Sequence, residues 1–153
     1  MDSSSQKAPV LFIGHGSPMH AILDNSFTQT LGRLRGLMPK PRAVLCISAH
    51  WMTKGTGVTR MLHPKTIHDF YGFPQELFDV QYPAPGDPAL ADEIRATIKE
   101  PPILPDEDGW GLDHGTWAVL RHMYPEASVP VVQLSLDLKQ PPEYHYELGQ
   151  KLR

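Results

Sequence analysis

The sequence predicts an α/β fold with parallel strands, and three observations in its first third carry that prediction. An apolar run at 10–13 has the length of a buried strand. Apolar residues at helical spacing follow, from Phe27 to Met38, and Pro39 ends that helix. A second apolar run, at 43–48, predicts another strand. The order strand, helix, strand favours a parallel pair, because a helical crossover returns the chain in the same direction.

The remaining elements follow from local signals. Asp24 or Asn25 is expected to cap the first helix, and Asp87 followed by Pro88 marks the start of a later one. Residues 63–86 are expected to form one long functional loop that contains a short helix. The predicted elements are a strand at 56–61, a short helix at 75–78, helices at 87–99, 113–123 and 142–153, and a strand at 129–135.

The last predicted helix has no capping signal at its C-terminal end, and no strand follows it. We therefore expect either a protein that ends on an edge helix or a piece of something longer. The length of 153 residues is typical of a single domain. We expect a loose polar tail over residues 1–8 and one domain over residues 9–153.

The composition excludes several classes of protein. A formal net charge of −3, with 41% hydrophobic and 20% charged residues, argues against a nucleic acid or an anionic membrane surface as the main partner. No apolar run approaches the ~20 residues of a membrane-spanning helix, and the first residues lack the apolar segment of a signal peptide. Cys46 is the only cysteine, so a disulfide is excluded within the chain and a reducing, cytoplasmic location is expected.

Two histidines follow the two apolar runs of the first third. His15 comes directly after the 10–13 run and Gly14, and His50 follows the 43–48 run and Ala49. If both runs are neighbouring parallel strands, both imidazoles emerge at the carboxyl edge of the sheet, where α/β folds place ligands. Imidazole is a common ligand of Fe, Zn, Cu and Ni. We therefore predict that His15 and His50 are metal ligands.

A third histidine, His114, lies where a loop meets a predicted helix. Asp113, directly before it, is expected either to orient the ring or to cap the helix. A histidine near a helix N-terminus is held in its neutral form and can act as a base. The alternative is a hydrogen-bonded loop histidine without a catalytic role.

Aromatic residues surround a fourth histidine, His68, in the long loop. Phe70 and Phe73 follow it closely, and this loop is expected to be either a pocket wall for a flat ring or an aromatic loop packed on the domain. Trp51, next to His50, is a further candidate for the pocket wall. We assign Trp51, His68, Phe70 and Phe73 as candidate substrate-binding residues.

Five ordered motifs in this chain resemble the class III extradiol ring-cleavage dioxygenases, in the branch of the 4,5-DOPA dioxygenases. The resemblance runs from about Val10 to Arg153. The motifs are Gly14-His15-Gly16-Ser17-Pro18-Met19, Ser48-Ala49-His50-Trp51, Thr66-Ile67-His68-Asp69-Phe70, Phe73-Pro74-Gln75-Glu76-Leu77 and Leu112-Asp113-His114-Gly115-Thr116-Trp117.

The resemblance implies a three-layer α/β/α sandwich around a mostly parallel sheet, and a non-haem metal enzyme that opens a catechol ring with O2. It implies Fe(2+) as the metal, with Zn(2+) as the alternative in the same site. His15 and His50 match the two N-terminal ligands of the family, and His114 matches its acid/base histidine. Members of the family are longer and carry a further ligand in a C-terminal part, so the resemblance implies an N-terminal portion that is truncated at its C-terminus.

Two other classes of function stay open at this point. One is a zinc-dependent hydrolase on the same sheet edge. The other is a non-catalytic truncated module that binds a partner or associates with itself as a homo-oligomer. Metal identity and oxygen uptake with a catechol discriminate between these classes and the dioxygenase.

Overall fold

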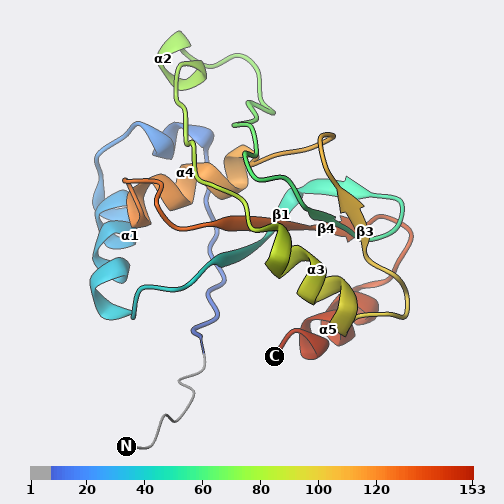
Figure 1. Ribbon diagram of the computed structural model, residues 1–153. Coiled ribbons are helices and arrows are strands. Elements are labelled where there is room, and N and C mark those ends of the chain that lie inside the picture. The colour runs from blue at the N-terminus through green and yellow to red at the C-terminus, as the bar shows by residue number, and fades with distance from the viewer. Residues whose placement is uncertain (1–7) are drawn as a thin grey trace, which may run out of the picture.

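A four-stranded mixed sheet forms the middle layer of the computed structural model, which describes residues 8–153 (Figure 1). Its strands lie in the order β1-β4-β2-β3. The pairs β1 with β4 and β2 with β3 are parallel, whereas β2 and β4 are antiparallel. The strands are β1 (Val44–Thr53), β2 (Gly57–Thr59), β3 (Leu104–Asp106) and β4 (Val131–Asp137).

Helices cover both faces of this sheet (Figure 1). On one face, Leu31 of α1 and Trp117 of α4 belong to one buried apolar cluster; on the other, Ile94 of α3 and Leu148 of α5 belong to a second. The three-layer α/β/α arrangement is therefore confirmed. The helices are the 3-10 turn η1 (Pro18–Ala21), α1 (Ser26–Leu37), α2 (Gln75–Phe78), α3 (Pro88–Thr97), α4 (His114–Met123) and α5 (Pro142–Lys151).

The capping signals of two helices are confirmed in detail. The side chain of Asn25 accepts hydrogen bonds from the backbone N–H groups of Phe27 and Thr28, and the Thr28 hydroxyl accepts one from the backbone of Asn25. This reciprocal pair satisfies N–H groups that have no partner within the helix. Asp87 caps α3 through a 3.0 Å bond that its side chain accepts from the N–H of Leu90.

Two short strands differ from the sequence prediction. The strand expected at 56–61 is limited to the three residues of β2. The strand β3 falls in a proline-rich stretch that the sequence did not mark as a strand. Pro105 lies in β3, and a proline is tolerated there because β3 is at the edge of the sheet and needs no donor on its outer side.

The strand predicted at 10–13 is wrong. Residues 8–17 contain no strand, and Val10 and Phe12 are almost fully exposed. The expected pairing of neighbouring strands before His15 and His50 is therefore wrong as well. The physical reason is that an apolar run only suits a strand, whereas a strand exists through hydrogen bonds to a neighbour. Among residues 8–153 no neighbour pairs with this run.

The strand β1 has the sequence of an interior strand but lies at the edge of the sheet formed by residues 8–153. Its apolar residues Ile47 and Met52 are about half exposed, whereas β4 is buried along nearly its whole length. An edge strand presents unpaired N–H and C=O groups to any strand that approaches. We call these two exposed apolar features, the run at 10–12 and the free edge of β1, the open edge.

The loose tail predicted for residues 1–8 lies outside the described residues except for Ala8. No helix within residues 8–153 has the length and the apolar composition needed to cross a membrane.

We predict that the 153-residue chain associates with itself through the open edge as its concentration rises. A double variant, Phe12→Asp with Ile47→Lys, places charges on that surface and should shift the equilibrium toward the monomer, because charged side chains blunt exposed sheet edges. Sedimentation velocity over a range of concentrations measures this. Tyr146→Lys, at an exposed aromatic of α5, is the matched control and should associate like the wild type. A chain that stays monomeric throughout would contradict the prediction.

Candidate metal centre

Three imidazoles from separate parts of the chain meet at one point. They belong to His15 in the segment before η1, His50 in β1, and His114 at the first position of α4. One ring nitrogen from each lies within 4.8 Å of the other two. The Nε2 atoms of His15 and His50 are 2.9 Å apart, and the ring centroids of His50 and His114 are 4.0 Å apart. We call these three residues the histidine cluster.

A break in strand register positions His50. The sequence predicts that the strand ends before His50, but β1 continues to Thr53. Ile47 pairs with Leu134 and Met52 with Leu136, so five steps along β1 match only two along β4. This irregularity interrupts the regular alternation of side chains above and below the sheet between Ile47 and Met52, the stretch that contains His50. β-Bulges have the same effect and are common next to functional sites.

A tight turn positions His15. Gly16 follows it with a positive φ of 65°, a backbone conformation that glycine adopts without strain. The hydroxyl of Ser17 then caps η1 by accepting a hydrogen bond from the N–H of Met19. The chain therefore turns sharply after His15, although no strand precedes it among the described residues.

Asp69, in the long loop, holds the ring of His114. Its Oδ1 accepts hydrogen bonds from both the backbone N–H and the ring Nδ1 of His114, at 3.0 and 2.9 Å. Burial raises the pKa of Asp69, but these bonds outweigh it and keep the pKa below its usual value. Because a carboxylate only accepts, Nδ1 carries a proton, so the neutral ring has its free lone pair on Nε2.

Asp113 stands at the N-cap position of α4, as expected, but its side chain performs neither of the two predicted roles. Its side chain makes no capping bond to α4, and it does not bond the ring of His114. Asp69 does both instead, from 45 residues away in the sequence. Sequence reasoning missed Asp69 as a site residue because only the folded loop brings it to the start of α4; its place beside His68 in a recognised motif was the available signal.

The cluster has the donors that a metal ion needs. Burial, followed by the nearby His114 and His50, lowers the pKa of His15, which favours the neutral ring required of a metal ligand. The Nδ1 atom of His15 is buried and has no hydrogen-bond partner among residues 8–153. Three neutral imidazoles suit a transition metal such as Fe or Zn. The residues present therefore fit a metal ion.

Gly115 permits the close approach of α4 to β1. A Cβ atom at this position would lie 2.7 Å from the hydroxyl oxygen of Ser48 and 2.8 Å from Cδ2 of His50. Both distances are shorter than real Cβ contacts. A glycine directly after His114 is thus what allows the start of the helix to reach His50.

The four candidate substrate-binding residues lie at different distances from the cluster. Phe70 meets the ring of His114 edge to face at 5.6 Å, and Phe73 meets Phe70 at 5.4 Å. His68 lies further from the cluster than Phe70 does, and its Nε2 bonds the backbone carbonyl of Val80.

Trp51 is also packed into the protein rather than open to solvent. It is buried, and it stacks on Trp110 at 6.0 Å with nearly parallel planes. Phe70 is therefore the one of the four whose ring is in contact distance of a cluster histidine.

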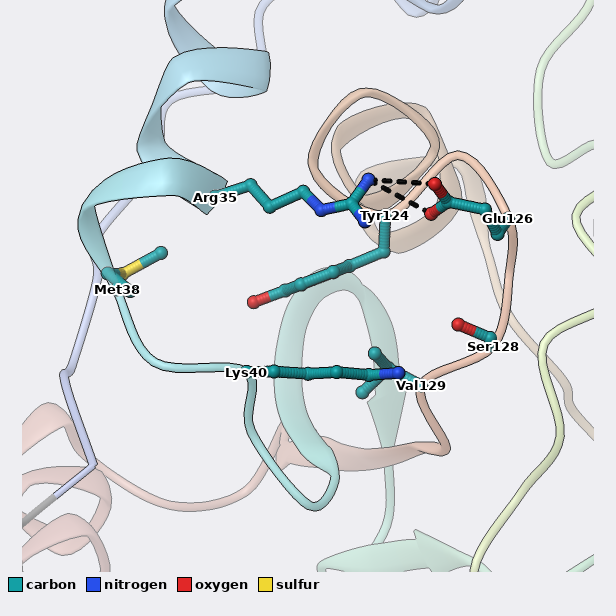
Figure 2. A pocket seen from close by; sticks show the side chains of 7 residues that line it. All are labelled: Arg35, Met38, Lys40, Tyr124, Glu126, Ser128 and Val129. Atoms are coloured by element: carbon teal, nitrogen blue, oxygen red, sulfur yellow. Dashed lines mark hydrogen bonds and ion pairs between the residues drawn. The ribbon is translucent and has the colours of Figure 1, made fainter.

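A small pocket lies away from the cluster, beside the residues that precede β1 and β4 (Figure 2). Its volume is about 120 Å³. Arg35 reaches across it to Glu126 and bonds both carboxylate oxygens, at 2.9 and 3.0 Å. The charge of Arg35 is thereby neutralised within the protein. The lining residues are Arg35, Met38, Lys40, Tyr124, Glu126, Ser128 and Val129.

Comparison with known proteins gives a consistent result. Residues 7–153 match the family described as the catalytic LigB subunit of aromatic ring-opening dioxygenase. The chain is 51% identical, over 97% of its length, to a protein of Escherichia coli (strain K12) named 4,5-DOPA dioxygenase extradiol, and covers 55% of that protein. It is 40% identical, over 99% of its length, to a Beta vulgaris protein of the same name, and covers 59% of it.

A solved structure supports the fold. A crystal structure of an uncharacterized protein from Escherichia coli K12 superposes on 84% of this chain with a TM-score of 0.70 and 43% sequence identity, and the match covers 48% of that chain. This chain therefore spans about half the length of the relatives that it matches.

Replacing Gly115 by alanine should destabilise the protein by about 1–3 kcal/mol, because the added methyl group overpacks the contact with Ser48 and His50. Urea unfolding followed by circular dichroism measures this. Gly149→Ala in α5 is the matched control, since nothing lies within 4 Å of a Cβ there, and it should be neutral or stabilising. Equal stability of the two variants would show that α4 does not approach β1 as closely as described.

Proposed function

The chain belongs to the family of the catalytic LigB subunit of aromatic ring-opening dioxygenases, and from this premise we propose that it is an extradiol ring-cleaving dioxygenase. Its substrates would be O2 and a catechol such as DOPA, the compound in the names of the Escherichia coli and Beta vulgaris relatives. The observation that carries the proposal is the histidine cluster, in which His114 is oriented by Asp69.

His15 and His50 would hold the metal, and His114 would remain free for proton transfer. Within the described part of the chain, His114 is the one member of the cluster with a carboxylate bonded to its ring, which supports a different role from those of the other two. The family resemblance favours Fe(2+), and Zn(2+) would fit the same imidazoles. When bound between His15 and His50, the metal would supply Lewis-acid and electron-transfer chemistry for the reaction of a catechol with O2.

His114 has the features of a general base. Its Nδ1 proton is held by Asp69, so Nε2 can accept a proton from a substrate hydroxyl. The resulting imidazolium would face the Asp69 carboxylate, which stabilises its positive charge. The same group can return the proton at a later step, because Asp69 remains bonded to Nδ1 throughout.

Aromatic side chains give this base an apolar surrounding. His114 is only 5% exposed, and the edge of Phe70 packs against its ring. An aromatic substrate could pack beside Phe70, with Phe73 behind it, while its hydroxyl groups point to the histidine cluster. A dry surrounding strengthens the hydrogen bond between His114 and Asp69.

We predict that His15→Ala and His50→Ala each remove most of the metal bound after equilibration with Fe(2+), because each deletes one ligand of a small donor set. Elemental analysis of the purified variants measures the metal content. His63→Ala, at an exposed histidine outside the cluster, is the control and should keep the wild-type content. Full occupancy in both cluster variants would refute the assignment of the ligands.

Activity is best tested on two proteins, because this chain covers only about half the length of its relatives. One is the chain itself, and the other is the chain joined to the part of the Escherichia coli relative outside the match. With Fe(2+) and DOPA, we expect oxygen consumption and a yellow ring-opened product chiefly from the longer protein. The reason is that the cluster supplies only three imidazoles, whereas the family resemblance implies a further ligand in the C-terminal part that the longer protein includes. Absence of catechol-dependent oxygen uptake in both proteins would contradict the proposal, and bound zinc with hydrolytic activity would favour the hydrolase.

In the active protein, His114→Ala should lower turnover by about 10²–10⁴-fold, the range expected for loss of a general acid or base. Its metal content should stay close to that of the wild type. Steady-state oxygen consumption together with elemental analysis separates the two effects. A loss of metal as large as that of His15→Ala would instead make His114 a ligand.

A further inference from the structure

Asp113 is a buried carboxylate whose hydrogen-bond partners are all neutral groups. It is 0% exposed. Its Oδ1 accepts a 2.7 Å hydrogen bond from the Ser48 hydroxyl, and its Oδ2 accepts bonds from Nε2 of Gln133 and Nε1 of Trp110, at 2.7 and 3.2 Å. Among residues 8–153 it forms no ion pair, although a buried charge is costly without an opposite charge nearby.

The hydrogen bonds identify this group as a carboxylate. The oxygen of Ser48 already accepts a bond from the backbone N–H of His50, so its own proton points to Asp113. Gln133 and Trp110 present N–H groups, which can only donate. Both oxygens of Asp113 therefore act as acceptors.

Gln133 fixes this carboxylate in place. Its Nε2 donates to Oδ2 of Asp113, and its Oε1 accepts from the backbone N–H of Asp113. Gln133 is itself fully buried in the middle of β4, which has an otherwise largely apolar sequence. A polar side chain in that position stabilises the fold only when its own partners are satisfied, and Asp113 supplies both.

The fixed negative charge lies beside the histidine cluster. Oδ1 of Asp113 and Cδ2 of His50 lie 3.2 and 2.8 Å from the point where a Cβ of Gly115 would be, so both border the same small space. Ser48 connects the two, since it bonds the carboxylate with its hydroxyl proton and the backbone of His50 with its oxygen.

We propose that Asp113 is the counter-charge of the histidine cluster: a buried carboxylate, held out of the ligand set by Gln133, that favours a divalent cation bound to neutral imidazoles. This inference rests on the proposed function, because it takes the cluster as a metal site. Neutral imidazole ligands carry no negative charge to offset that of a divalent cation, and the Asp69 carboxylate is bonded to the ring of His114. At short range inside a protein, a second negative charge offsets a further part of the cation's charge. Asp113 acts through this field and through Ser48, and is a positioning residue.

The alternative is that Asp113 only holds α4, β1 and β4 together. Asp113→Asn separates the two roles. An asparagine can turn its carbonyl oxygen to Gln133 and Trp110 and its amide to Ser48, whose hydroxyl can rotate to accept. This variant keeps the hydrogen bonds and the shape but removes the charge.

The experiment is a calorimetric titration of the metal-free 153-residue chain with Zn(2+), together with the thermal midpoint of the metal-free protein. Asp113→Asn should weaken binding by about 10–100-fold, the usual effect of removing an outer partner of a metal site, with little change in that midpoint. Asp108→Asn, the matched control, removes an exposed carboxylate from the loop between β3 and α4 and should bind Zn(2+) like the wild type.

A double variant, Asp113→Asn with Gln133→Glu, returns a negative charge to the same contact and should recover most of the affinity. It also keeps the proposal open to refutation if the single variant folds poorly. Binding by Asp113→Asn equal to that of the wild type would overturn the counter-charge role, as would a double variant no tighter than the single one. A wild-type chain that binds no Zn(2+) and no Fe(2+) would instead overturn the metal site itself.

Discussion

The close contact between the first turn of α4 and the irregular part of β1 determines most of what this protein presents to a ligand. His114 and His50 approach to a ring distance of 4.0 Å only because Gly115 has no side chain. A helix N-terminus and a strand normally stay separated by the side chains between them. Here the glycine and the break in strand register remove that separation, and the third imidazole, His15, reaches the same point from a tight turn.

Polar groups stabilise this contact from both sides. Asp69 approaches from the long loop and bonds His114 twice, while Asp113 faces inward to Ser48 and Gln133. Two carboxylates thus lie close to three imidazole rings. Such an arrangement costs free energy by itself and is favourable around a cation, so the electrostatics and the donor geometry point to the same kind of ligand.

The open edge of β1 is the other feature that the folded chain leaves exposed. Its sequence suits an interior strand, and the apolar run at 10–12 is exposed as well. The histidine cluster belongs to the same two segments, since His15 follows that run and His50 lies in β1. Whatever packs on this surface would therefore also change how far the cluster is exposed to solvent.

The sequence by itself determined the helices, the caps of α1 and α3, and the residue types of the site. Local rules suffice for these features: Asn25 and Asp87 cap the helices that follow them, and Gly16 marks the turn after His15. The motifs around His15, His50 and His114 were also enough to identify the family. Only the tertiary structure decided that the run at 10–13 is unpaired, that Asp69 and not Asp113 holds His114, and that β1 passes through a register break. Each of these depends on a partner far away in the sequence, and local spacing carries no information about which partner the folded chain will supply.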